Sequence, residues 1–364
     1  MVKKDRHKSD FFLIGFLLTQ AAIPLHLLIN YGDGFRLIAL NTSPNLYRIF
    51  ETAYWLEAPL LLWYTRSLVY KNYQWSKVDF LFILPAIIYL VFTAANFYSL
   101  DYTTKYLALR DYQAVEAPVL RHLTGLARES LRVVFGIMCL IDIRHCRQQI
   151  RNRYSNADQI DLGWLKILVV AFMAVRVWAV LVSIALISKA HLNINIDFEL
   201  MGLTGNYTTF ILVSGLIFFS LMNSSLFEGI ESREEIKKAE NEKDQEKAEI
   251  DPDLINKIEN YMLVKKPFLA NILTLEQLAK QLEMPPRALS NAINRHFEQN
   301  FFEFVNHYRV EEAKALLADP VHKNNTMIEI MAECGFNSKA TFNTFFKKLV
   351  GSTPSQYRAE KIKT

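Results

Sequence analysis

The pattern of apolar and polar positions divides the chain into two dissimilar parts near Glu228. Up to Phe227 the sequence is almost continuously apolar and aromatic, with short polar connections. A charged stretch follows, and beyond it the apolar positions recur at the spacing of short amphipathic helices. The first part is suited to lipid and the second to water. We therefore predict an all-α chain with a membrane helix bundle followed by a soluble helical domain.

Six segments of the first part are apolar over the length that a membrane-crossing helix needs, about 20 residues. They lie at residues 10–30, 46–70, 78–98, 120–143, 162–187 and 207–227. The first segment also resembles a secretory signal peptide, but no small-residue cleavage site follows it. We therefore predict a membrane domain of six spans over residues 1–227.

The charges in the short connections give an independent estimate of the topology. One side of the predicted bundle collects most of the basic residues: Lys3, Lys4, Arg6, Lys8, Arg66, Lys71, Lys77, Arg144, Arg147, Arg151 and Arg153. The opposite side is poorer, with Arg36, Lys105, Arg110 and Lys189, and with Arg48 and Arg121 at helix edges. Since basic connections stay in the cytoplasm, the pattern predicts that both termini are cytoplasmic.

Ionisable residues within apolar spans are costly and often mark a functional site. Four of them suggest a polar pocket that opens to the outside and holds an anionic signal: Glu57, Arg128, Arg132 and Arg176. Arg128 and Arg132 are four residues apart and share a helix face. The alternative is structural, because Glu57 and Arg176 would also satisfy each other as a buried pair.

Residues 228–252 form a charged stretch of alternating acids and bases, which favours a solvated helix. In the soluble domain, Thr274 and Gln277 have the spacing of a capping box, and Pro286 suits the first turn of the next helix. A helix, a tight turn and a second helix with a polar face form a helix-turn-helix unit.

A second helix-turn-helix unit follows the long helix that begins at Phe301. Gly335 is expected to end a helix in the left-handed conformation, and Ser338 to cap the next one. In that helix the spacing predicts a buried stripe made of four residues, namely Phe342, Phe345, Phe346 and Leu349.

These motifs carry a family resemblance. TLEQLAKQL, YRVEEAKALL and above all GFNSKATFNTFFKKLVGSTPSQYR resemble the two-part DNA-binding domain of AraC/XylS bacterial transcription regulators. The resemblance covers residues 253–360 and finds no counterpart in the apolar part, although membrane-anchored members of this family are known. It implies two recognition helices, joined by one rigid helix, in successive major grooves of DNA.

The resemblance, carried over residue by residue, assigns the DNA contacts. The first recognition helix would use Arg287, Ser290, Asn291 and Asn294, and the second would use Lys339, Asn343, Thr344 and Lys347. Arg and Lys suit the acceptors of guanine, and Asn suits adenine. Lys347 is expected to reach phosphate.

The chain lacks the motifs of catalysis and metal binding. It has no nucleophile and base constellation, no glycine-rich phosphate loop and no zinc spacing, so we expect no enzyme activity, metal or cofactor. The three cysteines, Cys139, Cys146 and Cys334, have no disulfide spacing and are expected to be reduced.

The predicted function is that of a one-component transcription regulator in the bacterial inner (cytoplasmic) membrane. Its expected partners are promoter DNA, the lipid bilayer, RNA polymerase and a small-molecule or lipid signal, with a homodimer as one arrangement. The family favours activation. The alternative is a membrane transporter or membrane enzyme with an accessory helical interaction domain; against it, the spans show no internal repeats.

Overall fold

The computed structural model describes residues 8–70, 73–110, 118–157, 162–192 and 252–363, with positions 207, 208, 211, 214 and 215. In these ranges the regular secondary structure is helical, with isolated bridge positions such as the antiparallel bridge between Tyr154 and Thr274. Contacts between residues divide the chain into two compact units. The first draws on Met1–Arg144 and Leu162–Arg233, and the second on His145–Asp161 and Glu234–Thr364.

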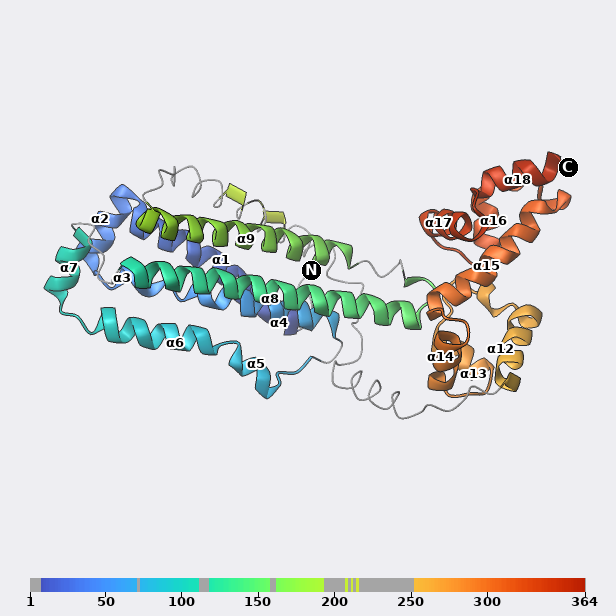
Figure 1. Cartoon of the computed structure of the whole chain (residues 1–364), viewed down its shortest axis with the longest axis horizontal. Coiled ribbons are helices and arrows are strands. Elements are labelled where there is room, and N and C mark those ends of the chain that lie inside the picture. The colour runs from blue at the N-terminus through green and yellow to red at the C-terminus, as the bar shows by residue number, and fades with distance from the viewer. Residues whose placement is uncertain are drawn as a thin grey trace, which may run out of the picture. The chain divides into compact units, whose positions relative to one another are not determined.

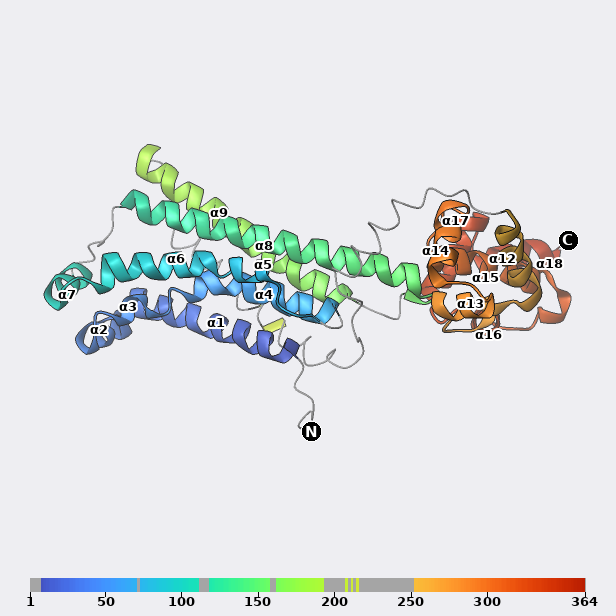
Figure 2. The same ribbon diagram turned by 90° about the horizontal axis from the view of Figure 1, so that it is seen from below.

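The first unit is a bundle of long helices with shorter helices at its ends (Figures 1 and 2). Its elements are α1 (Lys8–Tyr31), α2 (Asp33–Thr42), α3 (Leu46–Ile49), α4 (Ala53–Val69), α5 (Lys77–Leu81), α6 (Leu84–Thr93), the π-helical turn η1 (Ala94–Tyr98), α7 (Tyr102–Arg110), α8 (Pro118–Arg153) and α9 (Gly163–Leu192). The last residues of α8, from His145, belong to the second unit.

Helices α1 and α4 pack along each other through fully buried side chains, among them Phe16 and Leu62. A Cβ atom on Gly15 would lie 3.0 Å from the Leu60 side chain, so this glycine permits the close approach of the two helices. The core of this unit thus runs along the helix axes, and the outer faces of the helices are left to the surroundings.

Among the residues that the structure describes, three helical segments are long and apolar enough to cross a membrane: Ser9–Tyr31, Lys77–Tyr98 and Gly163–Ala185. Between 22% and 33% of their most apolar windows is buried inside the protein. Large apolar side chains such as Phe11 and Ile167 are therefore exposed, by 68% and 70%. These faces are apolar without being part of the protein core.

These segments match three of the six predicted spans, and the other three are not confirmed. The segment 46–70 is divided between α3 and α4, and α4 has 17 residues. The segment 120–143 lies on α8, which is 36 residues long and carries several charges. Most of 207–227 lies outside the described residues, as does the charged stretch 228–251.

The second unit contains the C-terminal helices and two short 3-10 turns. They are α12 (Pro252–Lys265), η3 (Pro267–Leu269), α13 (Leu275–Gln281), α14 (Pro286–Arg295), α15 (Phe301–Ala318), η4 (Pro320–His322), α16 (Met327–Glu333), α17 (Lys339–Val350) and α18 (Pro354–Lys363). Helix α15 contributes to two hydrophobic cores. Phe304 and Val305 belong to the first core, with α12 to α14, and Val310 and Leu317 to the second, with α16 and α17.

Several local predictions in this unit are confirmed. Thr274 accepts a hydrogen bond from the backbone N–H of Gln277 and forms the capping box, and α14 begins at Pro286. Ser338 caps α17, and Gly335 has a φ of 81°.

The buried stripe of α17 was predicted incorrectly at one position. Phe342 and Phe346 are buried, and Phe345 is half-buried and packs against the second core. Leu349 is 41% exposed, and Val350 packs against this core instead.

Candidate nucleic-acid interface

The first helix-turn-helix unit is formed by α13 and α14. The turn between the helices places Glu283 at a φ of 53°, and Met284 donates its backbone N–H to the carbonyl of Ala279. Leu289, Ala292 and Ile293 bury one face of α14. The helix therefore has a fixed inner face and an outer face free to carry polar residues.

All four predicted contact residues of the first helix-turn-helix unit lie on α14, but they differ in exposure. Asn294 is exposed, and its amide donates a hydrogen bond of 3.2 Å to the hydroxyl of Ser290. Arg287, Ser290 and Asn291 are half-buried. The structure thus brings these residues together on one helix, with Asn294 the most accessible of them.

The second helix-turn-helix unit is formed by α16 and α17. Thr326 caps α16 in a capping box with Glu329, whose carboxylate accepts the Thr326 backbone N–H at 2.6 Å. This hydrogen bond lowers the pKa of Glu329. The helix ends at Glu333, Gly335 follows it with a φ of 81°, and the Ser338 hydroxyl caps the start of α17 by accepting from the Thr341 backbone N–H. Both ends of the turn are thus fixed by local hydrogen bonds and by one positive φ angle.

The four predicted contact residues of α17 are all exposed, namely Lys339, Asn343, Thr344 and Lys347. They line a surface hollow of about 450 Å³ together with Met327, Ile328, Phe342, Thr353 and Ser355. The hollow lies between α16, α17 and the start of α18. Cationic, amide and hydroxyl groups are thus collected in one concave surface.

The two helices share a charge pattern that suits a polyanion. Their cations are Arg287, Arg295, Lys339, Lys347 and Lys348, and neither sequence contains an acidic residue. Over residues 252–363 the balance is milder, with 15 Lys and Arg against 12 Asp and Glu, a net charge of +3. Positive charge is therefore concentrated on α14 and α17, where phosphate contacts would form.

The two helix-turn-helix units are held together at two points near the middle of α15. Arg309 is fully buried, and its guanidinium donates to the carbonyls of Phe268 and Ala270 at 2.8 and 2.9 Å. Burial lowers the pKa of Arg309 to about 10, which leaves it charged at neutral pH. In addition, a Cβ atom on Gly335 would lie 2.6 Å from the Phe268 carbonyl oxygen.

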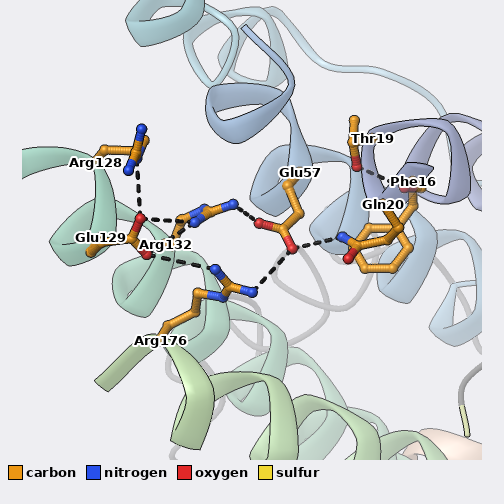
Figure 3. Close-up of polar contacts among 8 residues, drawn as sticks. All are labelled: Phe16, Thr19, Gln20, Glu57, Arg128, Glu129, Arg132 and Arg176. Carbon is orange, nitrogen blue, oxygen red and sulfur yellow. Dashed lines mark hydrogen bonds and ion pairs between the residues drawn. The ribbon is translucent and has the colours of Figure 1, made fainter. Parts of the chain in front are cut away.

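The predicted signal-pocket residues lie together in the first unit (Figure 3). Glu57 of α4 is fully buried and forms ion pairs with Arg132 of α8 and with Arg176 of α9, the latter at 3.4 Å. Glu129 pairs with Arg132 at 2.9 Å, with Arg128 at 3.1 Å and with Arg176 at 3.7 Å. The predicted alternative, a pair between Glu57 and Arg176, is therefore present.

Two members of this cluster were missing from the predicted set. Glu129 bridges all three arginines, and the Gln20 amide donates a hydrogen bond of 2.6 Å to Glu57. Glu129 had a sequence signal, since it is an acid between two arginines in an apolar segment. Gln20 had none, because a single amide in α1 gives no indication of its partner.

Comparison with known proteins agrees with the helix-turn-helix geometry of the C-terminal helices. A family model described as a helix-turn-helix domain matches residues 278–360. The C-terminal part of this chain is an AraC-type helix-turn-helix domain. The AraC-type domain is similar to the HTH-type transcriptional regulator YtdP of Bacillus subtilis (strain 168), with 33% identity over 89 residues. It is also similar to YijO of Escherichia coli (strain K12), with 33% identity over 91 residues.

A third relative is SACOL0084 of Staphylococcus aureus (strain COL), 30% identical over 89 residues. These alignments cover 24%, 25% and 24% of this chain, and 11%, 31% and 12% of YtdP, YijO and SACOL0084. The likeness to these three relatives therefore covers about a quarter of this chain and less than a third of each relative. No solved structure matches the chain.

Proposed function

We propose that this protein is a one-component transcription regulator of the bacterial inner membrane, with a membrane domain that senses a signal and an AraC-type domain that binds promoter DNA. One observation carries the proposal: the same chain holds two acid-free recognition helices and three apolar helices with exposed apolar faces. The expected domains are residues 1–227, 228–252 and 253–360.

For DNA binding, α14 and α17 enter successive major grooves. On α17, Lys339 donates to guanine acceptors, Asn343 pairs with adenine and Lys347 contacts phosphate. All three side chains are exposed along the hollow of the second helix-turn-helix unit, which supports this assignment. Arg287 and Asn291 of α14 are half-buried and so less accessible than the contact residues of α17. The second helix-turn-helix unit therefore contributes more of the contacts to bases.

For the membrane domain, we propose six spans with both termini in the cytoplasm. The exposed apolar faces of α1, α6 and α9 support contact with lipid. Helices α4 and α8 complete the bundle although they carry charges, because Glu57, Glu129, Arg132 and Arg176 are paired inside the protein. The basic connections give the orientation.

For the signal, we propose that the ion cluster of Figure 3 binds an anionic group, as in a lipid head group or a small carboxylate. As far as the structure describes the chain, the ion pairs of this cluster join three guanidinium groups to two carboxylates, which leaves the cluster itself with an excess of one positive charge. An added anion would balance it and would change the pairing of Arg176, whose ion pairs are the longest at 3.4 and 3.7 Å. Activation through RNA polymerase, and pairing of two protomers on tandem sites, complete the proposal.

The test uses the full chain purified in detergent and a gel-shift assay against DNA from upstream of its own gene. Binding is expected at low salt, and the Asn343→Ala variant should lose discrimination between matched and mutated sites. Lys265→Ala, an exposed cation in the last turn of α12, is the matched control and should bind as the parent does. A full chain that binds no promoter DNA at low salt would refute the proposal.

A further inference from the structure

The end of α8 and the turn after it form a tight contact with the AraC-type domain inside the second unit. The backbone N–H of Ser155 donates to the Leu273 carbonyl at 3.0 Å, and the Leu273 N–H donates to the Ser155 hydroxyl at 3.2 Å. Next to this pair, Tyr154 forms an antiparallel bridge with Thr274, the residue that caps α13. The Asn156 amide donates to the carbonyl of Asn271. A short strand-like contact thus joins this turn to the start of the first helix-turn-helix unit.

The same turn also reaches the helix that both helix-turn-helix units share. Arg309 of α15 donates to the Ser155 carbonyl at 3.3 Å, to the Ser155 hydroxyl at 3.3 Å and to the Asn156 side-chain oxygen at 3.0 Å. Ser155 is fully buried, and Ala157 is 8% exposed. Arg309 therefore binds the turn with the guanidinium that also holds η3 against α15.

The last turn of α8 adds a contact at the beginning of α15. Arg151 forms an ion pair with Glu303 at 3.3 Å, and its guanidinium lies 5.5 Å from the centre of the Phe302 ring. Lys348 of α17 lies 3.9 Å from the same carboxylate. The contact of residues 151–157 thus extends along α15, and it shares the Glu303 carboxylate with Lys348 of the second helix-turn-helix unit.

Helix α8 connects this contact to the ion cluster by continuous helical backbone. It runs without interruption from Pro118 to Arg153, and in the first unit it carries Glu129 and Arg132, which pair with α9 and α4. In the sequence, residues 228–252 lead into α12, and the contact at the end of α8 is a second, non-covalent connection to the AraC-type domain.

We propose that residues 151–157 are an intramolecular docking segment, and that α8 passes its state through them to Arg309 and both helix-turn-helix units. This inference rests on the proposed function and specifies its regulation. A ligand that shifts α8 would change how Ser155 and Asn156 engage Arg309, because these groups accept hydrogen bonds from one guanidinium whose remaining partners fix η3.

The docking is tested first by disulfide formation in the full chain, in membranes. Residues facing each other in an antiparallel bridge have Cα atoms about 4.5–5.5 Å apart, within the range that a disulfide spans. We therefore expect the pair Tyr154→Cys and Thr274→Cys to crosslink on oxidation. A protease site placed within 228–252 allows detection, because the two fragments stay joined on a non-reducing gel.

The matched control is the pair Gln148→Cys and Thr274→Cys. Gln148 is an exposed residue of α8 in the same unit, and it lies six residues before Tyr154, about 9 Å along a helix axis. Both pairs lose the Thr274 cap, so they differ only in the position of the second cysteine, on α8 for Gln148 and in the turn after α8 for Tyr154. Equal crosslinking of the two pairs, or none for the Tyr154 pair, would overturn the docking.

The regulatory role is tested with the double variant Ser155→Ala and Asn156→Ala and a promoter reporter. The variant removes side-chain hydrogen bonds to Arg309, Leu273 and Asn271 without changing the AraC-type domain. Loss of a few such bonds lowers the ratio of docked to undocked molecules by roughly tenfold or more. When the double variant is combined with the Tyr154→Cys and Thr274→Cys pair, crosslinking should fall accordingly. Promoter output should change by a similar factor at equal protein level.

Promoter output that stays at the parent level while crosslinking falls would overturn the regulatory role. A parent chain without any promoter DNA binding would instead refute the proposed function. The crosslink reads docking without DNA, so the two failures are distinguishable.

Discussion

Replacement of Gly335 by alanine tests how the two helix-turn-helix units are held together. Gly335 ends α16 with a φ of 81°, in the left-handed region that L-residues avoid. A Cβ atom there would lie 2.6 Å from the Phe268 carbonyl oxygen and 2.8 Å from that of Leu269. These atoms belong to the backbone of η3, so they cannot move aside as the end of a flexible side chain would.

The expected cost has two parts. The left-handed conformation costs an alanine about 1–2 kcal/mol. The Cβ contact requires η3 to move away from Gly335, which weakens the hydrogen bond from Arg309 to Phe268, and overpacking of this kind costs about 1–3 kcal/mol. Together they amount to about 2–5 kcal/mol, a large share of the roughly 5–15 kcal/mol that stabilises a domain.

Gly351 provides the matched control. It has a φ of 85°, and a Cβ atom added to it would meet nothing within 4 Å. Gly351→Ala should therefore lose only the conformational part, about 1–2 kcal/mol. The assay is thermal or urea unfolding of the fragment 252–364 followed by circular dichroism, in which each kcal/mol lowers Tm by about 4–8 °C in a domain of this size.

We predict that Gly335→Ala destabilises the domain more than Gly351→Ala by at least about 1 kcal/mol. We also expect weaker binding to a two-groove site, because the relative position of α14 and α17 depends on the contact at η3. Equal destabilisation by the two variants would refute the idea that the approach of Gly335 to η3 joins the two units.

Single side chains give three further predictions. Lys347→Ala should weaken binding to all DNA sequences alike and reduce the slope of log affinity against log salt by about one, as measured by titration at several salt concentrations; an unchanged slope would remove Lys347 from the phosphate contacts. Burial raises the pKa of the Cys334 thiol to about 12. The folded fragment should therefore react with iodoacetamide at pH 8 about a thousandfold more slowly than the unfolded fragment. For the same reason, the free energy of unfolding should fall as pH rises above the ordinary thiol pKa of about 8.5. Rapid alkylation of the folded fragment would contradict this burial. Glu57→Gln should lower the free energy of unfolding by about 3–5 kcal/mol, because it breaks a buried ion pair with Arg132. The loss is measured as a lower melting temperature of the full chain in detergent. A parent-like melting temperature would show that the cluster does not stabilise the bundle.

The parts of the fold that were predictable from the sequence depend on local signals. The capping box of Thr274, the start of α14 at Pro286 and the left-handed Gly335 each depend on residues within one turn, and all three are confirmed. The prediction for Leu349 was wrong, because at the end of α17 it is Val350 that packs against the second core. The family resemblance identified the domain, whereas its DNA contacts stay predictions.

The docking of residues 151–157 was not predictable in the same way. Ser155 and Arg309 are separated by 154 positions, and a polar turn between two apolar segments looks like any connection. Arg309 itself carried a signal, because it lies four residues from Val305 and from Ala313 on the buried stripe of α15. A charged residue at such a position implies partners inside the fold, but the pattern does not identify them.

The most direct test of the central claim is a genome-wide measurement of promoter occupancy with the full chain tagged at its C-terminus. Membranes would be separated from soluble material after crosslinking, and DNA recovered from each fraction. We predict discrete promoter sites recovered with the intact 42.2 kDa chain in the membrane fraction. Recovery of promoter sites only with a shorter soluble fragment, or of no promoter sites at all, would contradict the proposed membrane-bound regulator.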